Sequence, residues 1–224
     1  MKGEVGTQVI VQIKRENQIL DFVLKRETIQ LPLVHSKKID GICYLRIHSF
    51  DLGIQKKFSE ELLKLMPCQT FVFDVRGNPG GVVDEVVRIL ESFIPYEKPI
   101  LTISSSEKKE IISSKNQTFF PFEKSTVILI DEATASAAEI FAGVLKYYYP
   151  DQVKLVGQKS YGKGSVQEVV ELLEHSLLKY TVALRHIANQ KDSLNQKGLI
   201  PDLMLQDDPA TPQDELLEKI GIKL

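Results

Sequence analysis

The chain has 224 residues, of which 43% are hydrophobic and 8% aromatic, and its formal net charge is −2. This length and apolar content suffice for one large domain, or for one domain and a fragment of another. The balanced charge argues against nucleic acids and anionic membranes as partners, and no apolar stretch reaches the length of a membrane-spanning helix.

The cysteines and histidines show no metal-binding pattern. Cys43 and Cys68 have neither the spacing of metal ligands nor that of a disulfide framework. The four histidines are scattered, and none forms a helical metal-binding pair with another. We therefore expect no metal site, and the redox compartment stays undetermined.

Two strands are predicted at the beginning of the chain. Residues 7–14 alternate between apolar and polar side chains, and residues 19–25 form a matching strand after a turn. A domain seldom opens with a hairpin that has nothing before it to pack against. We therefore expect residues 1–15 to be the end of another domain, and residues 16–38 to be connecting strands, with Pro32 on an edge.

Strands and helices alternate in the next part of the chain. The expected elements are a strand (39–47), an amphipathic helix (51–66), a buried strand (70–75), a helix (82–93), a strand (100–103) and a polar hairpin or flexible excursion (104–122). This alternation is typical of an α/β layered fold.

The segment 127–145, VILIDEATASAAEIFAGVL, is predicted to be a buried strand, a tight turn and a helix that begins at Ser136. Small residues surround Ser136, and a helix N-terminus favours negative charge, which suits an alkoxide nucleophile. A purely structural interpretation is also open, because Ser136 and Glu139 have the spacing of a capping box.

The last third of the chain is predicted to be richer in antiparallel strands. The expected elements are a strand (153–156), a loop (157–164), two paired strands (165–173 and 177–184), a turn (197–202) and a short helix (213–220).

Three glycine-bearing or small-residue stretches each follow a predicted strand, after Val75, Ile130 and Val156. Strand ends of this kind line the ligand crevice in layered α/β proteins, so we expect the three to converge. The first, RGNPGG at residues 76–81, offers backbone N–H groups that could bind an oxyanion, or it is simply a tight strand–helix connection.

The loop 157–164, GQKSYGKG, nearly matches a phosphate-binding loop. Gly164, however, stands where a hydroxyl is needed to bind a metal, and no clear helix follows. We therefore disfavour nucleotide binding. Lys163 between two glycines is unusual for a solvated loop lysine and indicates a lysine turned inward toward a partner.

Serine and lysine can form a nucleophile–base pair. A lysine acts as a base only when neutral, so its pKa must fall from about 10.4, as burial in a closed apolar pocket would cause. Such pairs are variants of the serine–histidine arrangement. No histidine here lies in a comparable small-residue turn, which argues against a Ser-His-Asp triad.

Four motifs resemble those of the carboxyl-terminal processing peptidases, also called tail-specific proteases. They are DVRGNPGG (74–81), TASAAEI (134–140), SYGKGSVQ (160–167) and GLIPD (198–202), in this order. The likeness covers about residues 39 to 202. It implies a layered β/α core like that of ClpP and crotonase, with an additional antiparallel β section.

The resemblance implies a role for each residue that matches the family's motifs. Ser136 would be the nucleophile, Lys163 its general base, and Gln167 the residue that orients the lysine. The oxyanion hole and substrate contacts would come from the N–H groups of Gly81 and Ala137 and from Gly80 and Tyr161.

The family likeness also implies a domain plan. Residues 1–15 would be the end of a PDZ domain, residues 39–205 the peptidase core, and residues 206–224 a helical tail. The implied substrates are unstructured protein C-termini, cut through an acyl-enzyme without metal, nucleotide or other cofactor, and the implied location is extracytoplasmic. A homo-oligomer is also considered.

Three alternatives are open at this point. The chain could be a binding or scaffold protein that uses the peptidase fold without turnover. It could be an acyl-thioester enzyme, because the family's core resembles crotonase, although no coenzyme A signature is present. Nucleotide binding is the least favoured alternative.

Overall fold

The computed structural model describes residues 3–28, 32–39, 41–66, 68, 70–116, 125–172, 176–206 and 215–219. Two compact units make up the chain: unit 1, Met1–Pro32, and unit 2, Leu33–Leu224. The boundary expected after residue 15 falls inside unit 1. The expected helix 213–220 is described in its central part only, as α4 (Glu215–Lys219).

Unit 1 contains a two-stranded antiparallel hairpin. Strand β1 (Gln8–Arg15) pairs with β2 (Gln18–Lys25) in register around a two-residue turn, as the alternation predicts. Glu16 adopts a φ of 54° in this turn. Apolar side chains such as Ile10 and Ile19 remain largely exposed. That residues 1–15 are the end of a PDZ domain stays a prediction.

Unit 2 is built on a six-stranded sheet in the order β12-β9-β8-β5-β4-β3. Its strands are β3 (Val34–Ile39), β4 (Ile42–Ile47), β5 (Thr70–Asp74), β8 (Ser125–Ile130), β9 (Val153–Gly157) and β12 (Leu203–Met204). All pairs are parallel except β3 with β4. The expected strand 39–47 is confirmed over residues 42–47 as β4, but its expected start is wrong, because Ile39 ends β3 and the chain turns before β4.

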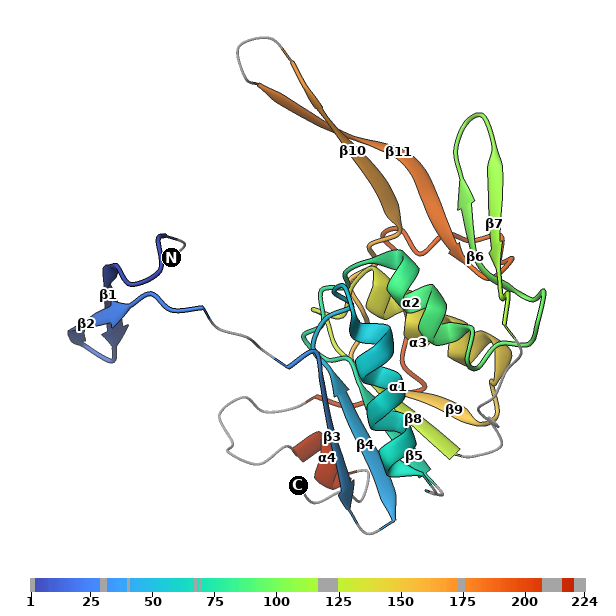
Figure 1. Cartoon of the computed structure of the whole chain (residues 1–224), viewed down its shortest axis with the longest axis horizontal. Helices are drawn as coiled ribbons and strands as arrows, with labels where there is room; N and C mark the ends of the chain where they lie inside the picture. The colour runs from blue at the N-terminus through green and yellow to red at the C-terminus, as the bar shows by residue number, and fades with distance from the viewer. Residues whose placement is uncertain are drawn as a thin grey trace. The chain divides into compact units, whose positions relative to one another are not determined.

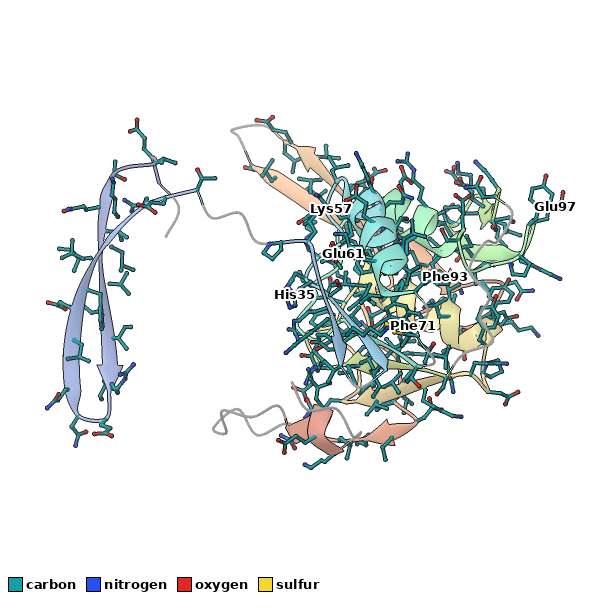
Figure 2. The ribbon with its side chains drawn as sticks, turned by 60° about the horizontal axis from the view of Figure 1, so that its bottom comes forward. His35, Lys57, Glu61, Phe71, Phe93 and Glu97 are labelled. Atoms are coloured by element: carbon teal, nitrogen blue, oxygen red, sulfur yellow. A yellow bond between two sulfur atoms is a disulfide. The ribbon has the colours of Figure 1, made fainter. Side chains whose placement is uncertain are left out.

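Helices α1 (Ile54–Leu65), α2 (Val83–Leu90) and α3 (Ala137–Tyr148) cover one face of this sheet (Figure 1). They enclose the main core, in which Phe71 and Phe93 are fully buried, as Figure 2 shows. On the opposite face Leu217 of α4 packs with a second, smaller apolar cluster. None of the helices in the described ranges reaches the length and hydropathy of a membrane span.

A second, antiparallel sheet has the order β10-β11-β6-β7. Its strands are β10 (Ser165–Glu171), β11 (Leu177–Ile187), β6 (Pro99–Ser104) and β7 (Lys109–Ser113). The β10–β11 hairpin extends well beyond the helices of unit 2 (Figure 1). The expected hairpin within residues 104–122 is confirmed for β7, and residues 117–122 lie outside the described ranges. The expected α/β fold with an additional antiparallel section is thus confirmed.

The structure contains a disulfide between Cys43 and Cys68, whose spacing in the sequence indicates no disulfide framework. Cys43 lies in β4, and Cys68 precedes the adjacent parallel strand β5. Their Cα atoms are 6.0 Å apart, within the usual span of a disulfide. Two cysteines 25 positions apart carry no signature in the sequence, because only the pairing of the two strands brings them together.

Candidate active site

Ser136 lies in the turn between β8 and α3, with 8% of its surface exposed. Its backbone φ of 57° and ψ of −118° lie outside the usual regions for a residue with a side chain. Asp131 fixes the start of the turn by accepting the Ala133 and Thr134 N–H groups at 3.1 and 2.8 Å. A strained serine held between a strand and a helix N-terminus is typical of a nucleophile.

Glu139 connects this turn to the loop that carries Lys163. Its fully buried carboxylate accepts the Ser136 N–H at 2.8 Å, which is the glutamate half of the capping box. The same carboxylate accepts the Lys163 N–H at 2.8 Å, the Gly162 N–H at 2.7 Å and the Ser160 hydroxyl at 2.6 Å. Capping is therefore one part of a larger role, and the sequence analysis missed the rest.

The glycine-rich loop 76–81 contacts the Ser136 turn through Asn78, which is fully buried. The Asn78 side chain donates to the Ile47 carbonyl and accepts the Gly80 N–H, both at 2.9 Å. The backbone carbonyl oxygen of Asn78 accepts the Ala135 N–H, also at 2.9 Å. The loop is thus fixed to the end of β4 and to the residue before Ser136.

Gly80, which has a φ of 101°, packs directly on the Ser136 turn. A Cβ atom added to Gly80 would lie 2.8 Å from the Ser136 Cβ and 2.9 Å from the Ala137 nitrogen. Among the described residues, neither the Gly81 N–H nor the Ala137 N–H has a hydrogen-bond acceptor. Two unpaired N–H groups beside a serine are what an oxyanion hole requires.

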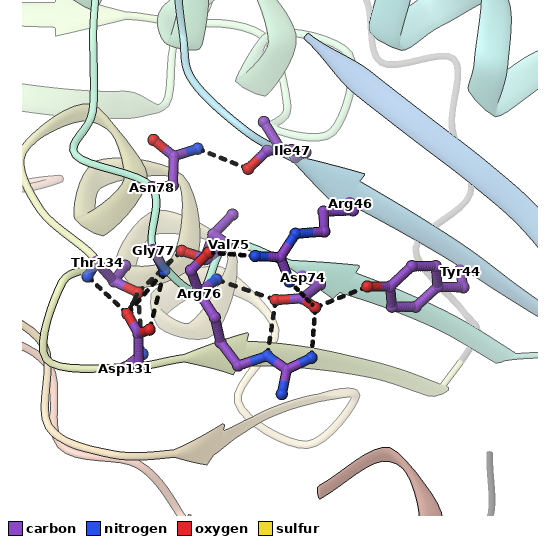
Figure 3. A network of polar contacts seen from close by, with 10 residues as sticks. All are labelled: Tyr44, Arg46, Ile47, Asp74, Val75, Arg76, Gly77, Asn78, Asp131 and Thr134. Carbon is purple, nitrogen blue, oxygen red and sulfur yellow. Dashed lines mark hydrogen bonds and ion pairs between the residues drawn. The ribbon is translucent and has the colours of Figure 1, made fainter. Parts of the chain in front are cut away.

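A buried charged cluster lies behind the glycine-rich loop, at the end of β5 (Figure 3). The fully buried Asp74 carboxylate accepts hydrogen bonds from Tyr44 at 2.7 Å, Arg46 at 2.7 Å and Arg76 at 2.6 Å. Burial and the neighbouring Asp74 charge raise the pKa of Tyr44, so its hydroxyl stays protonated and donates. This cluster fixes the base of the loop.

Asp131 also contributes to the loop, because both of its carboxylate oxygens accept the Gly77 N–H at 2.9 Å (Figure 3). Thr134 adds a further link by donating its hydroxyl to the Val75 carbonyl at 2.9 Å. The two strand ends are therefore joined at several points. Sequence analysis did not identify Asp131, Asn78 or Asp74, since only their positions in or next to glycine-rich motifs could have indicated them.

A cleft of about 1010 Å³ opens beside the Ser136 turn. The residues that line it come from the three strand ends, the β10–β11 hairpin and the segment between β11 and β12: Pro79, Glu132, Ala133, Ala135, Tyr161, Gly162, Lys163, Ser165, Gln167, Lys179, Asn195 and Gln196. The convergence expected from the sequence is therefore present. Of the expected site residues, Tyr161, Lys163 and Gln167 line the cleft.

The Lys163 side chain is exposed, whereas the sequence analysis expects it to turn inward. What binds inward is its backbone, through the N–H that donates to Glu139. Among the described residues, no hydrogen bond joins the Lys163 amine to the Ser136 hydroxyl or to Gln167. The site therefore holds the two expected catalytic residues on loops that Glu139 connects, without a hydrogen bond between their side chains in the described part of the chain.

The described residues show no arrangement typical of a metal or phosphate site. No group of three or more potential metal ligands is present among the described residues. The loop 157–164 leads into strand β10, so it offers no helix N-terminus to a phosphate.

Comparison with known proteins gives a family match over most of unit 2. Residues 41–205 match the sequence pattern of the family described as peptidase family S41. A "Probable CtpA-like serine protease" of Staphylococcus epidermidis is 30% identical over 223 residues, which are 98% of this chain and 44% of that protein. A Staphylococcus aureus protein of the same name is also 30% identical, with the same coverage. The chain thus spans less than half the length of these relatives.

Solved structures with the same fold include the photosystem II D1 C-terminal processing protease. It has a TM-score of 0.70 and 24% identity, over 91% of this chain and 57% of that chain. Mature CPAF in complex with lactacystin has a TM-score of 0.60 and 14% identity, over 91% of this chain and 64% of that chain.

Proposed function

The chain belongs to peptidase family S41, and from this membership and the site we propose that it is a serine endopeptidase with Ser136 as nucleophile. One observation carries the proposal: Ser136 is held in a strained turn beside two unpaired backbone N–H groups, those of Gly81 and Ala137. A structural cap needs neither the strain nor the unpaired donors.

The proposed reaction passes through an acyl-enzyme. Neutral Lys163 accepts the proton of the Ser136 hydroxyl as the oxygen attacks the substrate carbonyl, and the N–H groups of Gly81 and Ala137 stabilise the resulting oxyanion. Lys163 then donates the proton to the leaving amine, and water hydrolyses the ester. Gln167 orients the lysine, and the steps need no metal or nucleotide.

The exposed Lys163 side chain fits a resting form of the site. An ammonium group cannot act as a base, and removal of water from around it favours the neutral amine. We propose that bound substrate covers the cleft, brings Lys163 toward Ser136 and excludes water. Gly80 and Tyr161 are proposed to contact the substrate, since Gly80 packs on Ser136 and Tyr161 lines the cleft.

The proposed substrates are protein C-termini without stable structure, and the proposed location is extracytoplasmic. The D1 C-terminal processing protease, whose fold this chain shares, is named for action at a protein C-terminus and supports the first part. The Cys43–Cys68 disulfide supports the second, because disulfides persist mainly in oxidising compartments. A homo-oligomer stays a prediction.

Intact mass spectrometry of an unstructured substrate tail tests the proposal. We expect the unmodified chain to shorten the tail, and Ser136→Ala and Lys163→Ala to leave it intact. Lys109→Ala, which changes an exposed lysine of β7, is the matched control and should cut normally. Cleavage that persists in both site variants would disprove the assignment.

The second candidate is a scaffold that binds peptides without turnover. Lys163 favours it, because this residue is exposed and its amine forms no hydrogen bond with Ser136 among the described residues. A serine-directed acylating probe distinguishes the two, since it labels an activated Ser136 and leaves a scaffold unmodified.

A further inference from the structure

The inner face of the β10–β11 hairpin continues the cleft. Gln167 of β10 and Lys179 of β11 both line it. Successive residues of a strand point to opposite faces, so Val169 and Leu177, each two positions farther out, share the face of Gln167 and Lys179. The cleft therefore extends from the Ser136 turn along one face of the hairpin.

Apolar surface on this face is exposed. Val169 is 57% exposed and Leu177 is 69% exposed. The strand pairing places Val169 opposite Lys179 and Leu177 opposite Glu171. A surface on which a lysine lies between two exposed apolar side chains can bind an extended chain that carries both apolar and negative groups.

Lys179 is a cation that this part of the protein does not neutralise. Two other charged residues line the cleft: Lys163, which has its proposed role in the reaction, and Glu132, which follows β8. Lys179 forms no ion pair or hydrogen bond within the described ranges. Glu171 lies on the same face, diagonal to Lys179, and Glu168 is on the other face, where it accepts a hydrogen bond from Tyr180.

We propose that this face binds the substrate and that Lys179 selects a carboxylate within it. The inference rests on the proposed peptidase function. Val169, opposite Lys179, is six positions after Lys163, or roughly 20 Å along an extended strand. A substrate in extended conformation covers that distance in about six residues. The selected carboxylate is therefore about six residues from the scissile bond.

Two sources can supply this carboxylate. One is an Asp or Glu side chain, and the other is the terminal carboxylate of a protein tail cut about six residues from its end. Lysine attracts both as a point charge, so the experiment must separate them.

Binding to the Ser136→Ala chain tests the proposal without turnover. Fluorescence anisotropy gives the Kd of four matched tail peptides. Two lack acidic side chains and end in a free acid or an amide. The other two are amidated and carry Glu or Gln at one position. At least one carboxylate peptide should bind about three- to fivefold tighter than its neutral match, as for a partly exposed ion pair.

Two variants in the same background identify the residue responsible. Lys179→Gln should abolish the preference, whereas Lys109→Gln, on the far strand of the same sheet, should keep it. The pair of peptides that shows the preference identifies the source of the carboxylate. Leu177→Ser should weaken all four peptides alike.

Equal affinities within both pairs, or a preference that survives in Lys179→Gln, would overturn the inference. Absence of measurable binding by all four peptides would do so as well. None of these results would contradict the peptidase proposal, which depends on cleavage by the chain with Ser136 intact.

Discussion

The backbone N–H groups of Ser136 and Lys163 donate to the same oxygen, Oε2 of Glu139, at 2.8 Å each. The proposed nucleophile and the proposed base are 27 positions apart in the sequence, yet one buried atom sets the relation between their backbones. Glu139 is therefore expected to position the catalytic pair without touching the substrate.

Glu139→Gln tests this role with almost no change of volume. A glutamine oxygen cannot accept all four donors, and its NH₂ group faces N–H groups, so at least one buried donor loses its partner. We expect a loss of about 2 to 3 kcal/mol in unfolding free energy and at least a tenfold slower labelling of Ser136 by an acylating probe.

Glu91→Gln is the matched control, because Glu91 is also buried and accepts hydrogen bonds from Lys115 and Asn116 away from the cleft. It should lower stability and leave the labelling rate at that of the parent. Normal labelling in Glu139→Gln would refute the positioning role.

Gly80→Ala should inactivate the site. An added Cβ would lie 2.8 Å from the Ala135 carbonyl oxygen and from the Ser136 Cβ. The glycine-rich loop 76–81, which carries the proposed oxyanion donor Gly81, must therefore move away from the serine. Loss of one oxyanion donor typically slows catalysis about 100-fold or more. Peptide cleavage rates under saturating substrate measure this.

Gly53→Ala separates this contact from backbone strain. Gly53 has a similar φ of 86°, but an added Cβ there meets no atom within 4 Å. The variant should cost about 1 kcal/mol of stability and keep its rate. Equal rates in both variants would mean that the Gly80 contact is unimportant.

Reduction of the Cys43–Cys68 disulfide should destabilise unit 2. With 25 positions between the cysteines, the loop-closure estimate is about 3.5 kcal/mol. Urea unfolding with and without reductant measures the loss. The double variant Cys43→Ala, Cys68→Ala should not respond to reductant, and an unchanged midpoint in the parent would contradict the prediction.

The ion pair of Lys146 and Asp202 should weaken in acid. Burial alone would raise the pKa of Asp202, but hydrogen bonds from Lys146 and from the Leu155 N–H, both at 2.8 Å, outweigh it and hold that pKa below its usual value. The pair thus stabilises the fold at neutral pH, and the contribution disappears as the pH falls below about 4.

Asp202→Asn should therefore lower the melting temperature at pH 6 and narrow the difference from the parent at pH 3. The effect is small, below about 1 kcal/mol, because both side chains are partly exposed. Asp192→Asn removes the exposed partner of Lys197 and serves as control. A difference that is as large at pH 3 as at pH 6 would contradict the assignment.

Local sequence patterns predicted much of the fold. The buried runs that became β5, β8 and β9 and the small-residue turn at Ser136 were predicted, because each depends on neighbouring residues alone. The hairpin of β3 and β4 was missed since one apolar run concealed where β4 begins. The disulfide was missed because it depends on which strands pair.

The convergence of the strand ends at the candidate site was predictable from the sequence. The hydrogen bonds that hold the site together were less so. The i, i+3 spacing of Ser136 and Glu139 indicated a cap, but the three donors from residues 160–163 reach Glu139 only through the return of a distant loop. The exposure of Lys163 likewise depends on tertiary packing that no local pattern records.

The strands of the larger sheet follow one another in space in the same order as in the chain, from β3 to β12. A nascent chain can therefore add each strand to the edge of the sheet already formed. Until β9 and the following loop have emerged from the ribosome, Ser136 has no lysine beside it and Glu139 lacks three of its four donors. The proposed nucleophile is thus synthesised before the loop that completes the hydrogen bonding of Glu139.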